Sequence, residues 1–424
     1  MVKHDFLLMG QFFIRERFGR PQLLAGGLLL LFLLQCVWLV KRTSETAEPD
    51  PGERFRITEG ARQWRGGPPA GTAAAVPYRA VNEFAYPALE AHAGYDPDHS
   101  PLWYLLSAAP LLHWQEPLQA DLISRETWLA QRWLERVPYL AMGLLLGASL
   151  WYVARRLYGN AGGYIALTLY CFSPAVIRVC TLWDAEPEIG AAFGAFGAVF
   201  TAIAVAHTLY APREVVLWNW RRILLLAVAI ALAVGSQFSL IYVVPLALVF
   251  LWYLAPDRRA AASLIWLASC GLAFLAVVGS YFPHVGSFWQ GFKQAEFGVV
   301  WEAYGMLGAY TQLRDQLASS SPALVFALPA ALAVYVAWRR VRYFGNTAPL
   351  LVGVLFLLLG LGSPHYPGLG CKLVALPFLF LFVAGVSADL LETRYRNMVS
   401  ACVGGLLMAY AFWNLTALIT AGRS

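Results

Sequence analysis

The sequence has little charge, since only 13% of its 424 residues are Asp, Glu, Lys or Arg, about half the share found in soluble domains. Apolar and aromatic residues make up 59%, and the mean hydropathy is +0.56. A water-exposed surface of this composition would aggregate. The same numbers exclude a disordered chain, a collagen and a disulfide-stapled secreted module. We therefore expect an all-α polytopic membrane protein that forms a single integral membrane domain over residues 1–424.

Cofactor motifs and paired cysteines are also missing. The six cysteines show no CxxC spacing, which favours buried, unpaired thiols over disulfides or a zinc site. There is no Walker A, GxGxxG or HExxH motif, so the sequence gives no support for ATP-driven transport by this chain. The net charge of +6 could indicate a nucleic-acid partner. However, the basic residues stand in short clusters between apolar runs, as in membrane proteins, so no nucleic acid is expected.

Apolar runs of about 20 residues, the length that crosses a bilayer, recur along the chain. The first, 23–40, follows four basic residues and precedes no cleavage site, which predicts an uncleaved anchor and a cytoplasmic N-terminus. The uncharged run 223–254 has basic residues at both ends, so it should turn back at Gly235-Ser236-Gln237. With the anchor and the two arms of 223–254, the remaining runs bring the prediction to about eleven transmembrane helices. These remaining runs are 137–154, 161–179, 189–208, 260–282, 322–338, 348–361, 373–391 and 398–419.

Most of the acidic residues fall on the non-cytoplasmic side of this topology. Two long loops, 41–136 and 283–321, also face that side, and loops of this length usually have a function. In the first loop, 54–65 and 116–136 are amphipathic, and 101–112 is apolar but too short to cross. We expect these stretches to be juxtamembrane helices at the interface. Only six of the 25 acidic residues are predicted to be cytoplasmic: Asp5, Glu16, Glu214, Asp257, Asp389 and Glu392.

Outward-facing carboxylates are the first candidates for a functional site. Asp184 follows the third predicted span, where it could line a polar cavity or belong to a hydrated turn. Asp96, Asp98 and His99 lie in the run HAGYDPDH, whose imidazole and carboxylate groups could bind zinc or manganese. A polar loop that acts without metal is the alternative, so a divalent metal is left open as a cofactor.

Basic residues near the outer ends of the spans could bind a phosphate at the depth of lipid headgroups. Arg178, His365 and Lys372 are such residues, and snorkelling to the interface is the alternative. Lys372 is the best placed, because it begins the tenth span directly after a Gly/Pro-rich loop. Glu53 and Glu59 are acids of the first loop, and each could equally be solvated surface.

Four segments resemble the GT-C class of membrane glycosyltransferases, which use polyprenyl-phosphate sugars. The pattern is closest to the protein mannosyltransferases, the lipid A aminoarabinose transferases and the rhizobial lipopolysaccharide transferases. Two features depart from these families: the adjacent Asp-Glu pair after the first span is absent, and Gln237 stands where they have a lysine. The segments are ERFRITEGARQWRG (53–66), DHSPLWY (98–104), ARRLYG (154–159) followed by Ser173-Pro174 and Asp184, and KLVALP (372–377).

The resemblance implies a transferase that moves a sugar, with inversion, from a polyprenyl-phosphate donor to a glycan, lipid or protein acceptor. Glu53, matched by the motif, would be the general base, and Asp184 would help to position the acceptor. The donor phosphate would be held by Lys372, with help from Arg178 or His365. The enzyme would act at the outer face of the bacterial cytoplasmic (inner) membrane, surrounded by membrane lipids.

The substrate site implied by the resemblance also includes Glu59, Gln237 and the loop from Asp96 to His99. Two other functional classes fit the same layout. A translocator of lipid-linked sugars should carry acids deep inside its spans, and the sequence has almost none. A non-catalytic assembly subunit that kept the fold would account for the missing Asp-Glu pair.

Overall fold

The computed structural model describes residues 20–46, 51–67, 96, 98–113, 125–181, 187–210, 220–282, 284–295, 297–298, 306–337, 343–361 and 370–421. Within these ranges every regular element is a helix, as predicted for an all-α protein. Six of the described helices are long and apolar enough to cross a membrane, and several shorter apolar helices accompany them. The protein is therefore an integral membrane protein, while the count of eleven spans stays a prediction. The six are Pro21–Arg42, Trp133–Cys171, Glu188–Thr208, Pro256–Gly279, Lys372–Leu391 and Arg396–Thr416.

Helix α5 (Arg125–Cys171) consists of two antiparallel arms that meet at Gly159. Gly159 has φ 78° and ψ −172°, a conformation that is essentially restricted to glycine. The Tyr170 hydroxyl donates to the Gly143 carbonyl at 2.5 Å, which shows that the arms lie side by side. They correspond to the predicted second and third spans. The returning arm stops before Pro174, whose missing N–H breaks the ladder, and α6 (Pro174–Thr181) continues after the break.

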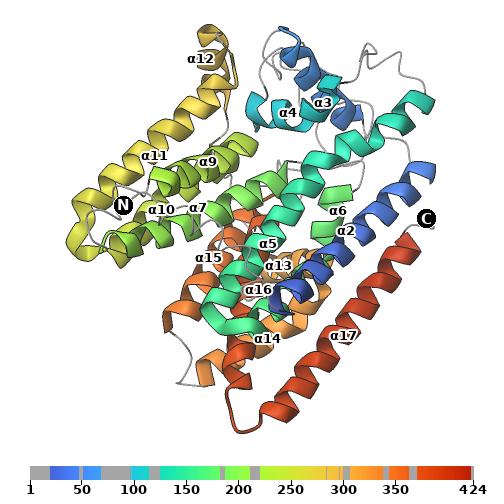
Figure 1. Ribbon diagram of the computed structural model, residues 1–424, viewed down its shortest axis with the longest axis vertical. Helices are drawn as coiled ribbons and strands as arrows, with labels where there is room; N and C mark the ends of the chain where they lie inside the picture. Colours follow the sequence, from blue (N-terminus) through green and yellow to red (C-terminus); the bar gives the residue numbers. More distant parts are fainter. Residues whose placement is uncertain are drawn as a thin grey trace, which may run out of the picture.

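The predicted turn in the run 223–254 is confirmed. Helix α9 (Trp220–Ser236) ends at the turn, a 3-10 helix η4 (Phe238–Tyr242) follows, and α10 (Val243–Leu254) runs back. Gln237, between α9 and η4, is extended, with φ −157° and ψ 113°. Both arms pack against α7 (Glu188–Thr208) and α11 (Arg259–Gly279), as Figure 1 shows.

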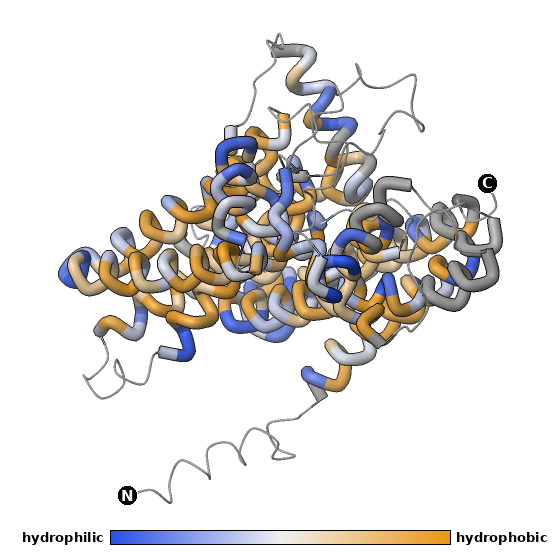
Figure 2. Tube along the Cα trace, turned by 90° about the horizontal axis from the view of Figure 1, so that it is seen from above, coloured by the Kyte–Doolittle hydropathy of each residue, from blue (hydrophilic) through white to orange (hydrophobic). Residues whose placement is uncertain are grey.

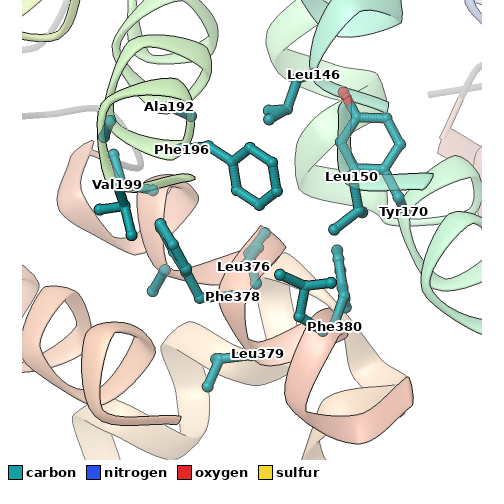
Figure 3. Packing of buried hydrophobic residues seen from close by; sticks show 14 of the residues in the cluster. Leu146, Leu150, Tyr170, Ala192, Phe196, Val199, Leu376, Phe378, Leu379 and Phe380 are labelled. Carbon is teal, nitrogen blue, oxygen red and sulfur yellow. The ribbon is translucent and has the colours of Figure 1, made fainter. Parts of the chain in front are cut away.

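The centre of the bundle is α16 (Gly370–Leu391), which packs against α5, α7 and α15 (Tyr343–Leu361). In its most apolar stretch 83% of residues are buried, against 11% for α17 (Arg396–Ala421), which lies along the outside of the bundle (Figure 1). Phe378 of α16 meets Phe196 of α7 and Phe356 of α15, with ring centroids 5.4 and 6.0 Å apart. Figure 3 shows Phe196 and Phe378 within this packing, and in Figure 2 most of the helical tube has the colour of hydrophobic residues.

The short helices of the first loop lie at one end of the bundle (Figure 1). Helices α3 (Pro51–Trp64) and α4 (Pro101–Ala108) follow the first span, α2 (Arg20–Thr46), and lie together at that end (Figure 1). The second loop contributes α12 (Val285–Gln294) and α13 (Met306–Ser320) before α14 (Pro322–Ala337). The stretch 116–136 differs from the prediction of a separate juxtamembrane helix, since its described part, from Arg125, runs without a break into the membrane arm of α5.

Candidate active site

Helices α3 and α4 pack so closely that they form one unit, here called the cap (residues 51–67 and 96–113). A Cβ atom at Gly60 would collide with the Tyr104 carbonyl oxygen, so only glycine allows this approach of the two backbones. The Trp64 indole N–H donates to the Leu105 carbonyl at 2.8 Å. The Gln63 amide donates to the Ser280 carbonyl, after α11, at 2.5 Å. The first bond joins α3 to α4 within the cap, and the second fixes the cap to the end of α11.

The loop that precedes α4 docks on the break between α9 and η4. The backbone N–H and the hydroxyl of Ser100 both donate to the Gly235 carbonyl, at 3.1 and 2.7 Å. In return, the Phe238 N–H donates to the Asp98 carbonyl at 2.9 Å. Residues 98–100 therefore run alongside residues 235–238, and His99 lies beside the Ser236-Gln237 break. Two candidates from distant parts of the sequence, His99 and Gln237, are thus brought together.

The Asp96 carboxylate organises this loop. Its Oδ1 accepts the backbone N–H groups of Asp98 and His99 at 2.9 and 3.1 Å. Its Oδ2 accepts the Tyr104 hydroxyl at 2.6 Å and lies 3.0 Å from His99 Nδ1. Burial favours a higher pKa for Asp96, but the charge and hydrogen bond of His99 and the bonds from Tyr104 and Asp98 outweigh it and hold the pKa well below its usual range. Asp96 is thus an ionised group whose acceptor positions are filled by protein donors.

The break itself contains buried polar side chains. Ser236 and Gln237 are each about 1% exposed, and the Gln237 amide nitrogen donates to the Ser239 hydroxyl at 2.7 Å. The fully buried Trp103 stands next to them and meets Tyr139 edge-on, with ring centroids 5.4 Å apart. Close packing alone does not require polar side chains here, so Ser236 and Gln237 are candidates for binding a ligand.

Comparison with known proteins gives structural neighbours. No protein-family model matches the sequence, and no curated protein matches it. The oligosaccharyltransferase of Archaeoglobus fulgidus, solved with Zn and sulfate, matches with TM-score 0.56 and 13% identity over 92% of this chain and 53% of that chain. ArnT from Cupriavidus metallidurans matches with TM-score 0.53 and 12% identity over 90% of this chain and 62% of that one. This chain has the GT-C fold.

The GT-C likeness covers nearly all of this chain, which spans little more than half of the archaeal enzyme it matches. At 12–13% identity the comparison shows the fold alone. The neighbours therefore show the architecture, whereas the roles of individual side chains have to be argued from this chain's own geometry.

The other predicted site residues of this GT-C chain are spread over several elements. Glu53 lies in α3, but its side chain is outside the described residues, as are Asp184 and His365. Glu59, also on α3, is buried and forms an ion pair with Arg62, whose Nε lies 3.1 Å from Glu59 Oε1. The two cations lie on bundle helices rather than in the cap: Arg178 is exposed on α6, and Lys372 is half-buried in the first turn of α16.

Sequence reasoning missed several buried residues that lie where the cap meets the bundle. Ser236, Trp103 and Tyr104 lie in segments that were singled out, yet none was named as a candidate. Glu135 and Arg136 are about 1% and 0% exposed, although the prediction placed them in a loop. The available signal was their position immediately before the apolar run 137–154, because charges at that depth are seldom buried without a reason.

Proposed function

We propose that this chain is a glycosyltransferase that moves a sugar from a polyprenyl-phosphate donor to a hydroxyl of a glycan, lipid or protein acceptor. The reaction would take place at the outer face of the bacterial cytoplasmic (inner) membrane, with the N-terminus in the cytoplasm. The observation that carries the proposal is the GT-C fold with the cap docked on the ends of the spans. The archaeal oligosaccharyltransferase, a structural neighbour, has been solved with a dolichol-phosphate, a lipid of the class proposed here as leaving group.

In the proposed mechanism the donor enters from the lipid and its phosphate is held by Lys372, with Arg178 or His365 as a second cation. The acceptor hydroxyl oxygen attacks the anomeric carbon as the bond from that carbon to the phosphate oxygen breaks. Polyprenyl phosphate leaves with the bonding electron pair, and the configuration is inverted. Glu53 receives the hydroxyl proton as general base. Asp184 and the Asp96–His99 loop position the acceptor.

The described residues contain no preformed cluster of metal ligands. Among them no three His, Cys, Asp or Glu side chains are grouped to hold a metal ion, and the acceptor positions of Asp96 are already used. Zinc in the archaeal neighbour's structure keeps a divalent ion plausible, with Glu53 or Asp184 as ligands. Measuring Zn²⁺ and Mn²⁺ binding to the purified chain, before and after Asp184→Asn, tests this option.

The test of the function uses the full chain in nanodiscs with radiolabelled polyprenyl-phosphate sugars and a cell-envelope extract as acceptor source. The wild type is expected to form labelled product, and Glu53→Gln is expected to lose at least a hundredfold in rate, the usual contribution of a general base. The matched control is Asp257→Asn, an exposed carboxylate at the opposite end of the bundle. Movement of the lipid across the membrane without product would indicate a translocator instead, and binding without product an assembly subunit.

A further inference from the structure

Three buried polar side chains lie at or beside the α9–η4 break, and each has an atom without a hydrogen-bond partner in the described part of the chain. They are the indole nitrogen of Trp103, the hydroxyl of Ser236 and the amide oxygen of Gln237. All three residues are at most 1% exposed. A buried polar atom that is left unpaired is destabilising, so it is rarely retained without a purpose. Three neighbouring ones indicate a binding subsite rather than a packing accident.

Gly190 of α7 allows the ring of Trp103 and the hydroxyl of Ser236 to meet. A Cβ atom there would collide with the six-membered ring of Trp103 and would lie 3.1 Å from the Ser236 hydroxyl. The ring of Trp103 and the hydroxyl of Ser236 therefore meet over the bare backbone of Gly190. Gln237 is the next residue along the chain, and its amide is anchored at one end by Ser239. The arrangement is preorganised, because residues of α4, α7 and α9 pack together here.

Resting on the proposed transfer reaction, we infer that Trp103, Ser236 and Gln237 form an uncharged subsite for the sugar of the lipid-linked donor. An amide, a hydroxyl and an indole N–H can donate to and accept from sugar hydroxyls, and a site built to bond a hydroxyl discriminates strongly in its favour. None of the three carries the positive charge that a phosphate prefers. The Asp96 carboxylate already bonds to His99 and Tyr104, so it would not bind a cationic sugar.

The position of the subsite favours a lipid-anchored ligand over a soluble one. The break ends a hairpin of apolar helices, α9 and α10, so it lies where the head of a membrane lipid can reach it. On its other side, the break is covered by the loop 98–100. The backbone N–H and the hydroxyl of Ser100 donate to the Gly235 carbonyl, and the Phe238 N–H donates to the Asp98 carbonyl. The sugar would enter when this loop lifts and these hydrogen bonds open.

The test compares the binding of two probes to the full chain in nanodiscs: a polyprenyl phosphate, and the same lipid carrying a neutral hexose (glucose, galactose or mannose). The wild type is expected to bind one of the hexose lipids about tenfold more tightly than the bare phosphate lipid, and Gln237→Leu should abolish that difference while leaving the affinity for the bare lipid unchanged. Ser236→Ala should reduce it in the same direction. Ser236→Ala should lower the melting temperature less than the control Gln63→Leu, because the Ser236 hydroxyl has no partner among the described residues, whereas Gln63 donates to the Ser280 carbonyl.

Three results would overturn the inference, and they separate it from the proposed function. If the wild type binds all hexose lipids no better than the bare lipid, there is no sugar subsite, although a lipid-phosphate site still stands. If both Gln237→Leu and Ser236→Ala keep the tenfold preference, the side chains at the break do not bind the sugar. If the wild type binds neither kind of lipid, the proposed function fails first and the subsite fails with it.

Discussion

The Oδ2 atom of Asp96 lies 3.0 Å from Nδ1 of His99 and accepts the hydroxyl of Tyr104 at 2.6 Å. One carboxylate thus joins the loop to helix α4 and fixes the ring of a buried histidine. The same loop is bonded through Ser100 to the end of α9. The orientation of His99 relative to Gln237 therefore depends on Asp96, which we regard as a positioning residue.

Asp96→Asn is expected to lower the stability at pH 7 by about 1.5–3 kcal/mol, the worth of hydrogen bonds to a charged group. Because its contacts hold the pKa of Asp96 below the usual value, the stabilisation is fully present above the unfolded pKa of about 3.9. It is lost as the pH falls below that value towards the folded pKa. Thermal unfolding in detergent at pH 7 and pH 3 should therefore show a gap between wild type and variant that narrows in acid. A gap of equal size at both pH values would contradict this account.

Gly60→Ala is expected to destabilise the cap by about 1–3 kcal/mol, because the added Cβ would collide with the Tyr104 carbonyl. Gly26→Ala in α2 is the control, since nothing lies within 4 Å of its Cβ position. Limited proteolysis of the first loop should be faster in the Gly60 variant and unchanged in the control. Equal protection in both would mean that α3 and α4 are not in contact in solution.

Gly159→Ala is expected to cost about 1–3 kcal/mol by straining the reversal between the two arms of α5. Space is not the reason, since nothing lies within 4 Å of the added Cβ. Gly404→Ala in α17 also has open space around it but no positive φ, so it should be neutral or slightly stabilising. The melting temperatures of the two variants provide the measurement, and a neutral Gly159→Ala would argue against the positive φ angle.

Lys372→Gln is expected to raise KM for the polyprenyl-phosphate donor about tenfold or more, because a charge-assisted bond to the phosphate is lost. The matched control is Lys293→Gln, which removes a lysine that lies over the ring of Trp289 on α12. Steady-state transfer kinetics with varied donor separate the two. A KM that rises equally in both variants would indicate a general effect of outer-face charge rather than a phosphate contact.

Much of the fold could be predicted, because apolar run length and flanking charge are local properties. The turn in the run 223–254 followed from basic residues at both of its ends and is confirmed at Gln237. The segment 116–136 shows the limit of the method. Amphipathic periodicity identified a helix, but continuity with the next span depends on α5 passing Pro138 without ending, which no local pattern indicates.

The sequence by itself determined that this chain is a helical membrane protein, since 59% apolar residues with so few charges can be buried stably only in a bilayer. It also nominated His99 and Gln237, each from its own motif. Only the tertiary structure decided that they are neighbours, through bonds between residues 135 positions apart such as Ser100 to Gly235. It also showed the unpaired atoms of Ser236 and Trp103. Such contacts depend on how helices pack, and packing is a property of the whole chain rather than of any segment.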